Sequence, residues 1–196
     1  MTAPKTLRDH AGIAWPAANF NDAVLLLIDA QREYTEGKLR LHGVDSAVQT
    51  MAGLLEKARR AGTPIVHVAQ NGKAGSALFD PEGPMSRFIA GIGPRDGEIT
   101  VVKSLPNAFA KTELDSKLKA TGRSNLIVAG FMTHMCISAT TRASVDLGYR
   151  TTIVAEGTAT RDLPDGNGGT IDATIVHRVA LAELGDRFAT IVPKLG

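Results

Sequence analysis

Short apolar segments rich in valine and isoleucine recur along the chain and alternate with longer segments of helical period. Each apolar segment has the length of a strand and is bounded by polar residues, glycine or proline. The segments lie at residues 23–29, 64–70, 98–104, 125–131, 150–156 and 188–193. We therefore predict six strands.

The segments between the strands show the spacing of amphipathic helices. The clearest helix is predicted at residues 45–61, where apolar side chains fall on one face and Gly62 and Pro64 then end the helix. Further helices are predicted at residues 108–122, 136–148 and 170–185. Strands that alternate with helices form parallel sheets, because right-handed crossovers leave few other packings. The predicted fold class is α/β, a three-layer doubly wound fold around a six-stranded parallel sheet.

The chain has the length of one domain and shows no repeat, low-complexity tract or linker. We predict a single domain over residues 1–196, with residues 1–22 as an N-terminal extension. Residues 70–86 form an irregular segment rich in glycine and proline directly after the second strand. Doubly wound folds bind ligands on that side, so we expect this segment to rim the site.

The amino-acid composition limits the classes of binding partner and the cellular locations that we expect for the protein. The chain is 43% hydrophobic and 21% charged, with a formal net charge of +2, which indicates neither disorder nor a nucleic-acid-binding surface. A small-molecule partner is therefore favoured. A single cysteine excludes an internal disulfide, and the N-terminal residues show no continuous apolar stretch of a secretory signal. We predict a cytoplasmic protein, with no membrane role because every apolar run is far shorter than the roughly 20 residues that span a bilayer.

Three polar residues stand at the ends of predicted strands. Asp29 closes the first strand, Lys103 closes the third, and Cys136 begins the helical segment after the fourth. The carboxyl ends of parallel strands meet at one edge of the sheet. We therefore expect the three side chains to lie together.

Such a trio suits an activated nucleophile. A free thiol has a pKa near ~8.5, and a helix N-terminus and a neighbouring ammonium both favour the thiolate, so we expect Cys136 to be activated. Asp29 can take the thiol proton and return it to a leaving amine, while Lys103 holds the carboxylate. Backbone N–H groups at the start of the helix can stabilise an oxyanion. These features predict acyl transfer through a thioester.

Each of these residues also has a structural interpretation. A lone cysteine in an apolar context is often an inert small hydrophobe, Asp29 alone could cap a loop, and Lys103 alone could be a solvated strand end. His67 and His177 are expected to be structural. His134 stands two residues from Cys136 and remains an alternative base, although so close a residue points elsewhere unless the turn folds back.

Three aromatic residues, Tyr34, Phe109 and Phe131, follow or flank strand ends, where they could either contact substrate or pack at the core edge. Two glycine-containing segments, 71–76 and 162–170, lack the spacing and context of phosphate or dinucleotide sites. We predict that both are loops and that the protein uses no cofactor.

The sequence resembles the isochorismatase-like cysteine hydrolases, which include nicotinamidases and N-carbamoylsarcosine amidases. The similar segments are "LLLIDAQREY", "VVKSLPNAF" and "VAGFMTHMCISATTRASVDLGYRTTIVAE", in the family's order. The resemblance implies that Cys136 is the nucleophile, Asp29 the proton carrier and Lys103 its partner. It also implies a cis peptide between Phe131 and Met132, an oxyanion hole formed by the N–H groups of Met132 and Cys136, and a homo-oligomer.

Departures from the family's subgroups indicate the reaction. Nicotinamidases carry an Asp-x-His metal motif after the second strand, whereas this chain reads "VAQNGKAG", so we expect no metal. True isochorismatases lack the cysteine that this chain keeps. The sequence therefore predicts metal-independent hydrolysis of an amide or related C–N bond of a small molecule. A vinyl-ether hydrolase and a non-catalytic flavodoxin-like module that binds a small acid are the alternatives.

Overall fold

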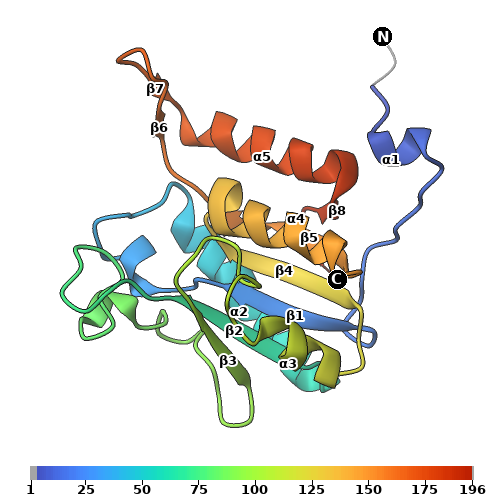
Figure 1. Ribbon diagram of the computed structural model, residues 1–196, viewed down its shortest axis with the longest axis horizontal. Helices are drawn as coiled ribbons and strands as arrows, with labels where there is room; N and C mark the ends of the chain where they lie inside the picture. Colours follow the sequence, from blue (N-terminus) through green and yellow to red (C-terminus); the bar gives the residue numbers. More distant parts are fainter. Residues whose placement is uncertain (1–3, 196) are drawn as a thin grey trace.

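A computed structural model describes residues 4–195 and contains a six-stranded parallel sheet in the order β3-β2-β1-β4-β5-β8 (Figure 1). The strands are β1 (Ala23–Ile28), β2 (Ile65–Gln70), β3 (Ile99–Lys103), β4 (Asn125–Phe131), β5 (Arg150–Ala159) and β8 (Ala189–Val192). The predicted fold class is confirmed, and each predicted strand is present. A separate antiparallel hairpin pairs β6 (Leu163–Pro164) with β7 (Thr170–Ile171).

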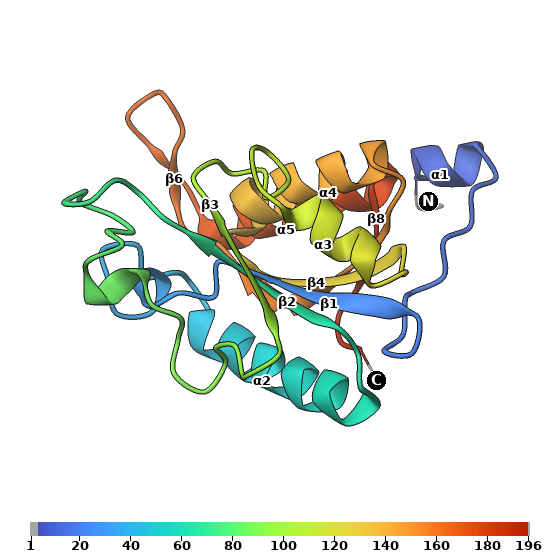
Figure 2. The ribbon, with the colours of Figure 1, turned by 60° about the horizontal axis from the view of Figure 1, so that its bottom comes forward.

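Helices cover both faces of the sheet. The α-helices of the described residues are α1 (Leu7–His10), α2 (Val44–Ala61), α3 (Leu114–Ala120), α4 (Ser138–Asp146) and α5 (Ala173–Arg187). Figure 2 shows α2 on one face and α3, α4 and α5 on the other. The crossover between β2 and β3 holds only the short 3-10 helix η2 (Pro84–Ser86) among its described elements. Another 3-10 helix, η1 (Arg32–Tyr34), follows β1.

The core has two halves, one on each face of the sheet. Leu25 and Leu27 of β1 pack in one cluster with Met51 of α2, whereas Leu26 packs in the other cluster with Leu184 of α5. Successive side chains of a strand point to opposite faces, so a strand covered on both sides needs apolar residues throughout. This requirement explains why β1 reads as an unbroken apolar run that is fully buried.

The predicted helix at 45–61 is α2. It ends where Gly62 adopts a left-handed conformation, with φ of 65°, and donates its N–H to the carbonyls of the last turn. Glycine reaches this conformation without the steric cost that a side chain brings.

The helix predicted at 108–122 was too long, since α3 covers only Leu114–Ala120. Lys111 has a φ of 58°, which an α-helix cannot contain, and the Thr112 hydroxyl donates to the Ala108 carbonyl at 2.6 Å. Local side-chain hydrogen bonding therefore holds a turn where apolar spacing alone predicts a helix.

The helix predicted at 170–185 also begins later than predicted. Thr170 and Ile171 form β7, and Asp172 then caps α5 by accepting a hydrogen bond from the Thr174 N–H at 2.7 Å. An aspartate that satisfies a free N–H of the first turn is a strong start signal for a helix. The helix continues to Arg187.

The order of the strands places a switch point between β1 and β4. The chain winds from β1 toward β3 on one side and from β4 toward β8 on the other, so the loops after β1 and β4 diverge and leave a crevice between them. These loops carry Asp29 and Cys136. The carboxyl ends of the strands lie toward the left of Figure 1, as do the β6–β7 hairpin and the loop after β2.

The described part of the N-terminal extension, residues 4–22, contacts the last elements of the fold. The Leu7 N–H donates to Asp186 Oδ1 at 2.8 Å, and the Trp15 carbonyl accepts a hydrogen bond from the Thr190 hydroxyl at 2.8 Å. Within residues 4–195, no helix combines the length and the apolar character needed to cross a membrane.

Candidate active site

The structure brings Asp29, Lys103 and Cys136 together from three strand ends. The Lys103 ammonium lies 2.7 Å from Asp29 Oδ2 and 3.3 Å from Cys136 Sγ. Asp29 is fully buried, and Lys103 and Cys136 are only 2% and 5% exposed. A buried carboxylate and ammonium in contact neutralise one another, and the thiol is the third member of this cluster.

Local backbone geometry positions Asp29. Its φ is 53°, in the left-handed region that aspartate tolerates better than most residues, and its N–H donates to the Val68 carbonyl at 2.8 Å. The second carboxylate oxygen, Oδ1, has no hydrogen-bond partner among the described residues. Burial raises the pKa of Asp29, and the Lys103 ammonium opposes this rise. Asp29 is therefore a stronger base than an exposed aspartate.

Two glutamines that the sequence analysis did not assign hold the lysine. Gln70 Oε1 accepts a hydrogen bond from the Lys103 ammonium at 2.7 Å. Gln31 fixes the backbone of Gln70 by accepting from its N–H at 2.8 Å and donating to its carbonyl at 2.9 Å. Gln31 also donates to the Ser86 carbonyl at 2.6 Å. The signal for Gln70 was its position at a fourth strand end, at the carboxyl end of β2.

The turn that carries Cys136 depends on a glycine. Gly130 has a φ of 122°, and a Cβ at this position would lie 2.0 Å from the Ile28 carbonyl oxygen, so β4 approaches β1 too closely for any side chain. The peptide bond between Phe131 and Met132 is cis. Cys136 then lies inside a π-helical turn, η3 (Thr133–Ile137), and not at the first residue of α4 as the sequence pattern predicted.

The resemblance to the family implies that the backbone N–H groups of Met132 and Cys136 form an oxyanion hole. The Met132 N–H has no acceptor among the described residues, and the Cys136 N–H donates to no described residue outside its own helical turn. The Ile137 N–H, in contrast, donates to the Met132 carbonyl at 3.2 Å. The Met132 N–H is thus an unused donor directly before the turn that carries Cys136.

The expected depression of the thiol pKa was wrong. Burial and the Asp29 carboxylate raise the pKa of Cys136 to about 12, and the Lys103 ammonium opposes this rise without overcoming it. Burial disfavours the charged thiolate, and the ammonium is already paired with the carboxylate. The thiol is therefore protonated at rest, so a nucleophilic attack requires transfer of its proton.

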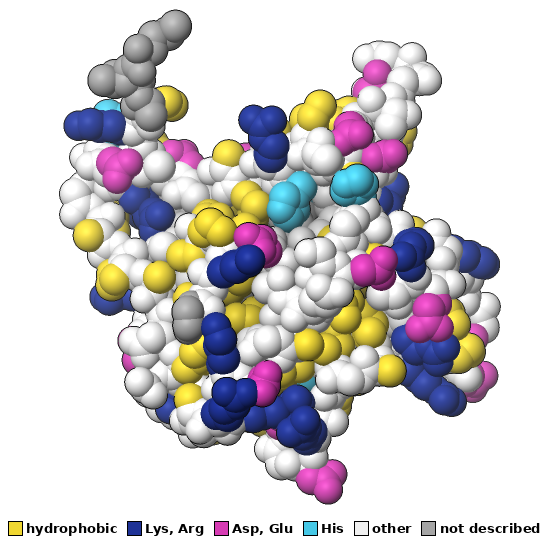
Figure 3. Space-filling view, turned by 180° about the vertical axis from the view of Figure 1, so that it is seen from behind, with side chains coloured by type: hydrophobic (Ala, Val, Ile, Leu, Met, Phe, Trp, Pro, Cys, Tyr) yellow, Lys and Arg dark blue, Asp and Glu magenta, His cyan; other side chains and the backbone are white. Residues whose placement is uncertain are grey.

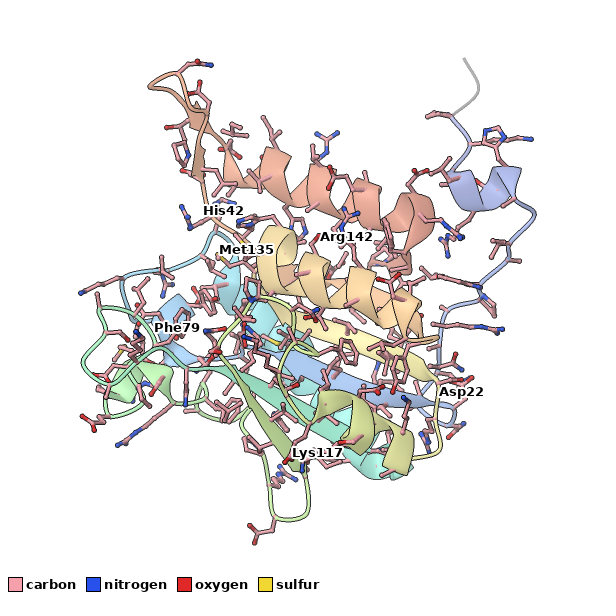
Figure 4. The ribbon with its side chains drawn as sticks, in the orientation of Figure 1. Asp22, His42, Phe79, Lys117, Met135 and Arg142 are labelled. Carbon is pink, nitrogen blue, oxygen red and sulfur yellow. The ribbon has the colours of Figure 1, made fainter. Side chains whose placement is uncertain are left out.

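The predicted pocket aromatics separate into two groups. Tyr34 lies between Phe79 and Phe131, with ring centroids 5.3 and 5.5 Å apart. Burial raises the pKa of Tyr34, and the charges of Asp29 and Cys136 raise it further. Phe79 belongs to the segment 70–86, so that segment reaches this end of the molecule (Figure 4).

Phe109 lies elsewhere. Its ring stacks on Tyr149, with the centroids 5.8 Å apart and the planes 20° apart. Tyr149 directly precedes β5, and therefore lies at the amino end of a strand whose carboxyl end faces the site. The structure thus gives Phe109 a packing contact and does not place it with Tyr34 and Phe131.

The three histidines discussed above each have a partner outside the cluster. His67 Nε2 lies 2.8 Å from Glu98 Oε2, and His177 Nδ1 lies 2.9 Å from the Thr133 hydroxyl. His134 Nδ1 lies 2.5 Å from the hydroxyl of Thr160. His134 therefore turns this nitrogen toward the end of β5 and not toward the thiol.

Arg161 is a site residue that the sequence analysis missed. It follows Thr160, which bonds His134, and its guanidinium lowers the pKa of His134, as burial does. It also opposes the raised pKa of Tyr34. Its buried Nε has no hydrogen-bond partner among the described residues, although Nη1 donates to the Asp162 carbonyl at 3.0 Å. Arg161 thus carries an unused hydrogen-bond donor, and its charge acts on both His134 and Tyr34.

Residues 4–195 contain no group of three or more histidine, cysteine, aspartate and glutamate side chains that could be the ligands of a metal ion. Metal independence stays a prediction, to be tested by chelation.

The chain is similar in sequence and fold to known proteins. A crystal structure of an isochorismatase from Pseudomonas putida matches with a TM-score of 0.94 and 43% identity over 97% of both chains. A secreted isochorismatase effector of Verticillium dahliae is 35% identical over 95% of this chain and 96% of its own length. A maleamate amidohydrolase of Pseudomonas putida is 34% identical over 67% of this chain and 70% of its own length.

One of these relatives is described as secreted, and the cytoplasmic location of this protein stays a prediction. Residues 23–192, which include every strand of the six-stranded sheet, match the family described as the isochorismatase domain. On this match, and on relatives that align over nearly their full length, the chain belongs to the isochorismatase family of hydrolases.

Proposed function

We propose that this protein is a cysteine amidohydrolase that cleaves a small amide through a thioester on Cys136. The observation that carries the proposal is the contact of one ammonium, that of Lys103, with both the Cys136 thiol at 3.3 Å and the Asp29 carboxylate at 2.7 Å. A nucleophile, a base and a counter-charge thus lie within reach of one another, which is the arrangement that nucleophilic catalysis requires. The similarity to an amidohydrolase supports the same reaction class.

Acylation begins with transfer of the thiol proton to Asp29. The raised pKa of the buried carboxylate favours its protonation, and the raised pKa of the thiol means that this transfer accompanies attack on the carbonyl carbon. The new C–S bond converts the carbonyl to an oxyanion. In this proposal the backbone N–H groups of Met132 and Cys136 donate hydrogen bonds to the oxyanion.

Collapse of the oxyanion breaks the C–N bond. Asp29 returns its proton to the leaving nitrogen, which departs as ammonia or an amine, and the acyl group stays on Cys136. Asp29 then takes a proton from water, which attacks the thioester and releases a carboxylic acid, and the thiol recovers its proton. Lys103 keeps the carboxylate oriented in both halves, and Gln70 holds Lys103.

Arg161 narrows the class of substrate. A guanidinium with an unpartnered, buried Nε, whose charge acts on Tyr34, suits an anionic group, since arginine binds carboxylates through charge-assisted hydrogen bonds. The substrate in this proposal is therefore a small amide that also carries a carboxylate. Tyr34 and Phe131 would contact its apolar part.

The test is a library of small amides screened for ammonia release, with the Cys136→Ala protein as blank. Succinamate and succinamide form a matched pair, because they differ in one carboxylate. Succinamate should have the higher kcat/KM, and Arg161→Gln should reduce this preference by about 10-fold or more. A preference that survives in Arg161→Gln contradicts the assigned substrate class. Ammonia release that persists in Cys136→Ala contradicts the function itself.

A further inference from the structure

A cavity of about 390 Å³ lies between the start of α2, the end of β5 and the first turns of α5. Pockets that hold small molecules start at about this size. Its lining residues are His42, Gly43, Ser46, Ala47, Ala155, Glu156, Thr158, Ala159, Thr160, Ala173, Thr174, His177 and Arg178. Asp29, Lys103 and Cys136 are absent from this set, so the cavity is separate from the candidate active site.

The side chains around this cavity favour an anion. Arg178 is exposed and forms no ion pair with a described residue, whereas Glu156, the acidic residue in the lining, lies 3.4 Å from the Lys194 ammonium. His42 and His177 add two imidazoles. Figure 3 shows histidine side chains close together on the face of the molecule seen from behind.

The apolar residues that line the cavity indicate the rest of the ligand, beyond its anionic group. Four alanines, at positions 47, 155, 159 and 173, provide apolar surface, while the polar groups stand around them. A highly charged ligand such as a nucleotide would leave several charges against this apolar surface, which is costly. A single carboxylate on a compact apolar body matches both the walls and the one unpaired guanidinium.

Two residues of the lining contact the turn that carries the nucleophile. His177 Nδ1 lies 2.9 Å from the Thr133 hydroxyl, and the Thr160 hydroxyl lies 2.5 Å from His134 Nδ1. Thr133 and His134 stand three and two positions before Cys136 in the sequence. Figure 4 labels His42 and Met135, the neighbour of Cys136, at the same end of the molecule. The cavity therefore lies directly behind the nucleophile turn.

We propose that this cavity binds a small organic monoanion, a carboxylate with an apolar body, and that its occupancy changes the reactivity of Cys136. The carboxylate contacts Arg178 and the nitrogen of His177 that does not face Thr133. Because His177 holds Thr133 through its other nitrogen, a ligand on the ring changes the position of the turn. The ligand thus regulates the enzyme from outside the active site.

The binding test uses 4-bromobenzoate and its neutral isostere 4-bromobenzamide. Anomalous scattering from crystals soaked with 4-bromobenzoate should place bromine in the cavity. Calorimetry should show that Arg178→Gln weakens 4-bromobenzoate binding by about 10-fold or more, because a charge-assisted hydrogen bond is lost. Arg187→Gln, a matched change on the same helix outside the cavity, should leave 4-bromobenzoate binding unchanged. The neutral 4-bromobenzamide should bind the native protein weakly, with an affinity similar to that of 4-bromobenzoate for Arg178→Gln.

The coupling test measures alkylation of Cys136 by iodoacetamide with and without saturating 4-bromobenzoate. The rate should change by about threefold or more in the native protein and in Arg187→Gln, and should not change in Arg178→Gln. Arg161→Gln should retain both the binding and the rate change, which separates this site from the substrate site. Bromine found only beside Cys136, equal binding by Arg178→Gln, or a bound cavity without a change in alkylation rate would each overturn the proposal.

Discussion

Removal of the Lys103 ammonium is the perturbation that best tests how the site is held together. Lys103→Met keeps the length of the side chain but leaves the fully buried Asp29 without the cation that lies 2.7 Å away. Removing one partner of a buried pair costs about 3–5 kcal/mol, because the remaining charge has no compensation. We expect the free energy of unfolding to fall by that amount near pH 8.

The pH dependence follows from Asp29. Burial already raises its pKa, and loss of the ammonium that opposes this rise raises it further. The folded variant then holds a proton that the unfolded chain releases above a pH of about 4, so stability falls as pH rises, by up to about 1.4 kcal/mol per pH unit. The variant should approach the native protein near pH 5 and differ most near pH 8.

Urea denaturation at pH 5, 6.5 and 8 measures these differences. The double variant Asp29→Asn with Lys103→Met removes both charges and should recover most of the lost stability. Lys119→Met is the control, since it breaks an exposed pair with Asp115 and should cost less than about 1 kcal/mol. A Lys103→Met protein whose loss is small, independent of pH and unaffected by Asp29→Asn would refute the reasoning.

Three further predictions concern the scaffold and the chemistry. Gly130→Ala should cost about 4 kcal/mol or more in urea denaturation, since its Cβ would meet the Ile28 carbonyl at 2.0 Å, whereas Gly53→Ala, with nothing within 4 Å, should not destabilise α2. Burial opposes ionisation of Glu98, but hydrogen bonds from Arg59, the Arg95 N–H and His67 lower its pKa to about 2. Glu98→Gln should therefore be less stable than the native protein at pH 6 in urea denaturation. This difference in stability should shrink as pH falls from about 4 toward 2, because the native Glu98 then takes up a proton. Exhaustive chelation should leave ammonia release unchanged, and activity that is lost with a stoichiometric metal would contradict metal independence.

The sheet and the three central residues could be predicted from the sequence, because each depends on a local pattern. A strand buried on both faces must be apolar throughout, as β1 is, and a polar residue at its end must lie at the edge of the sheet. Asp29, Lys103 and Cys136 could therefore be placed together before any distance was known.

Other features depend on packing between distant segments. The pKa of Cys136 is raised by burial, which the fold creates from several loops and which no local pattern encodes. Gln70 matters because Gln31, 39 positions earlier in the chain, fixes its backbone. Arg161 stands in the loop after β5, and its electrostatic effect on Tyr34 became evident only from the three-dimensional structure. The helix predicted from residue 108 begins only at Leu114, because a hydroxyl bonds the backbone in the preceding turn.

The covalent intermediate is the central claim, and mass spectrometry tests it most directly. The intact protein is mixed with a confirmed amide substrate in a single turnover, quenched in acid within milliseconds, and digested. An acyl group should appear on the peptide that contains Cys136, and Asp29→Asn should slow its formation by about 10²–10⁴-fold while its fold stays intact. A single turnover that releases product with no acylated Cys136 at any time would contradict the account.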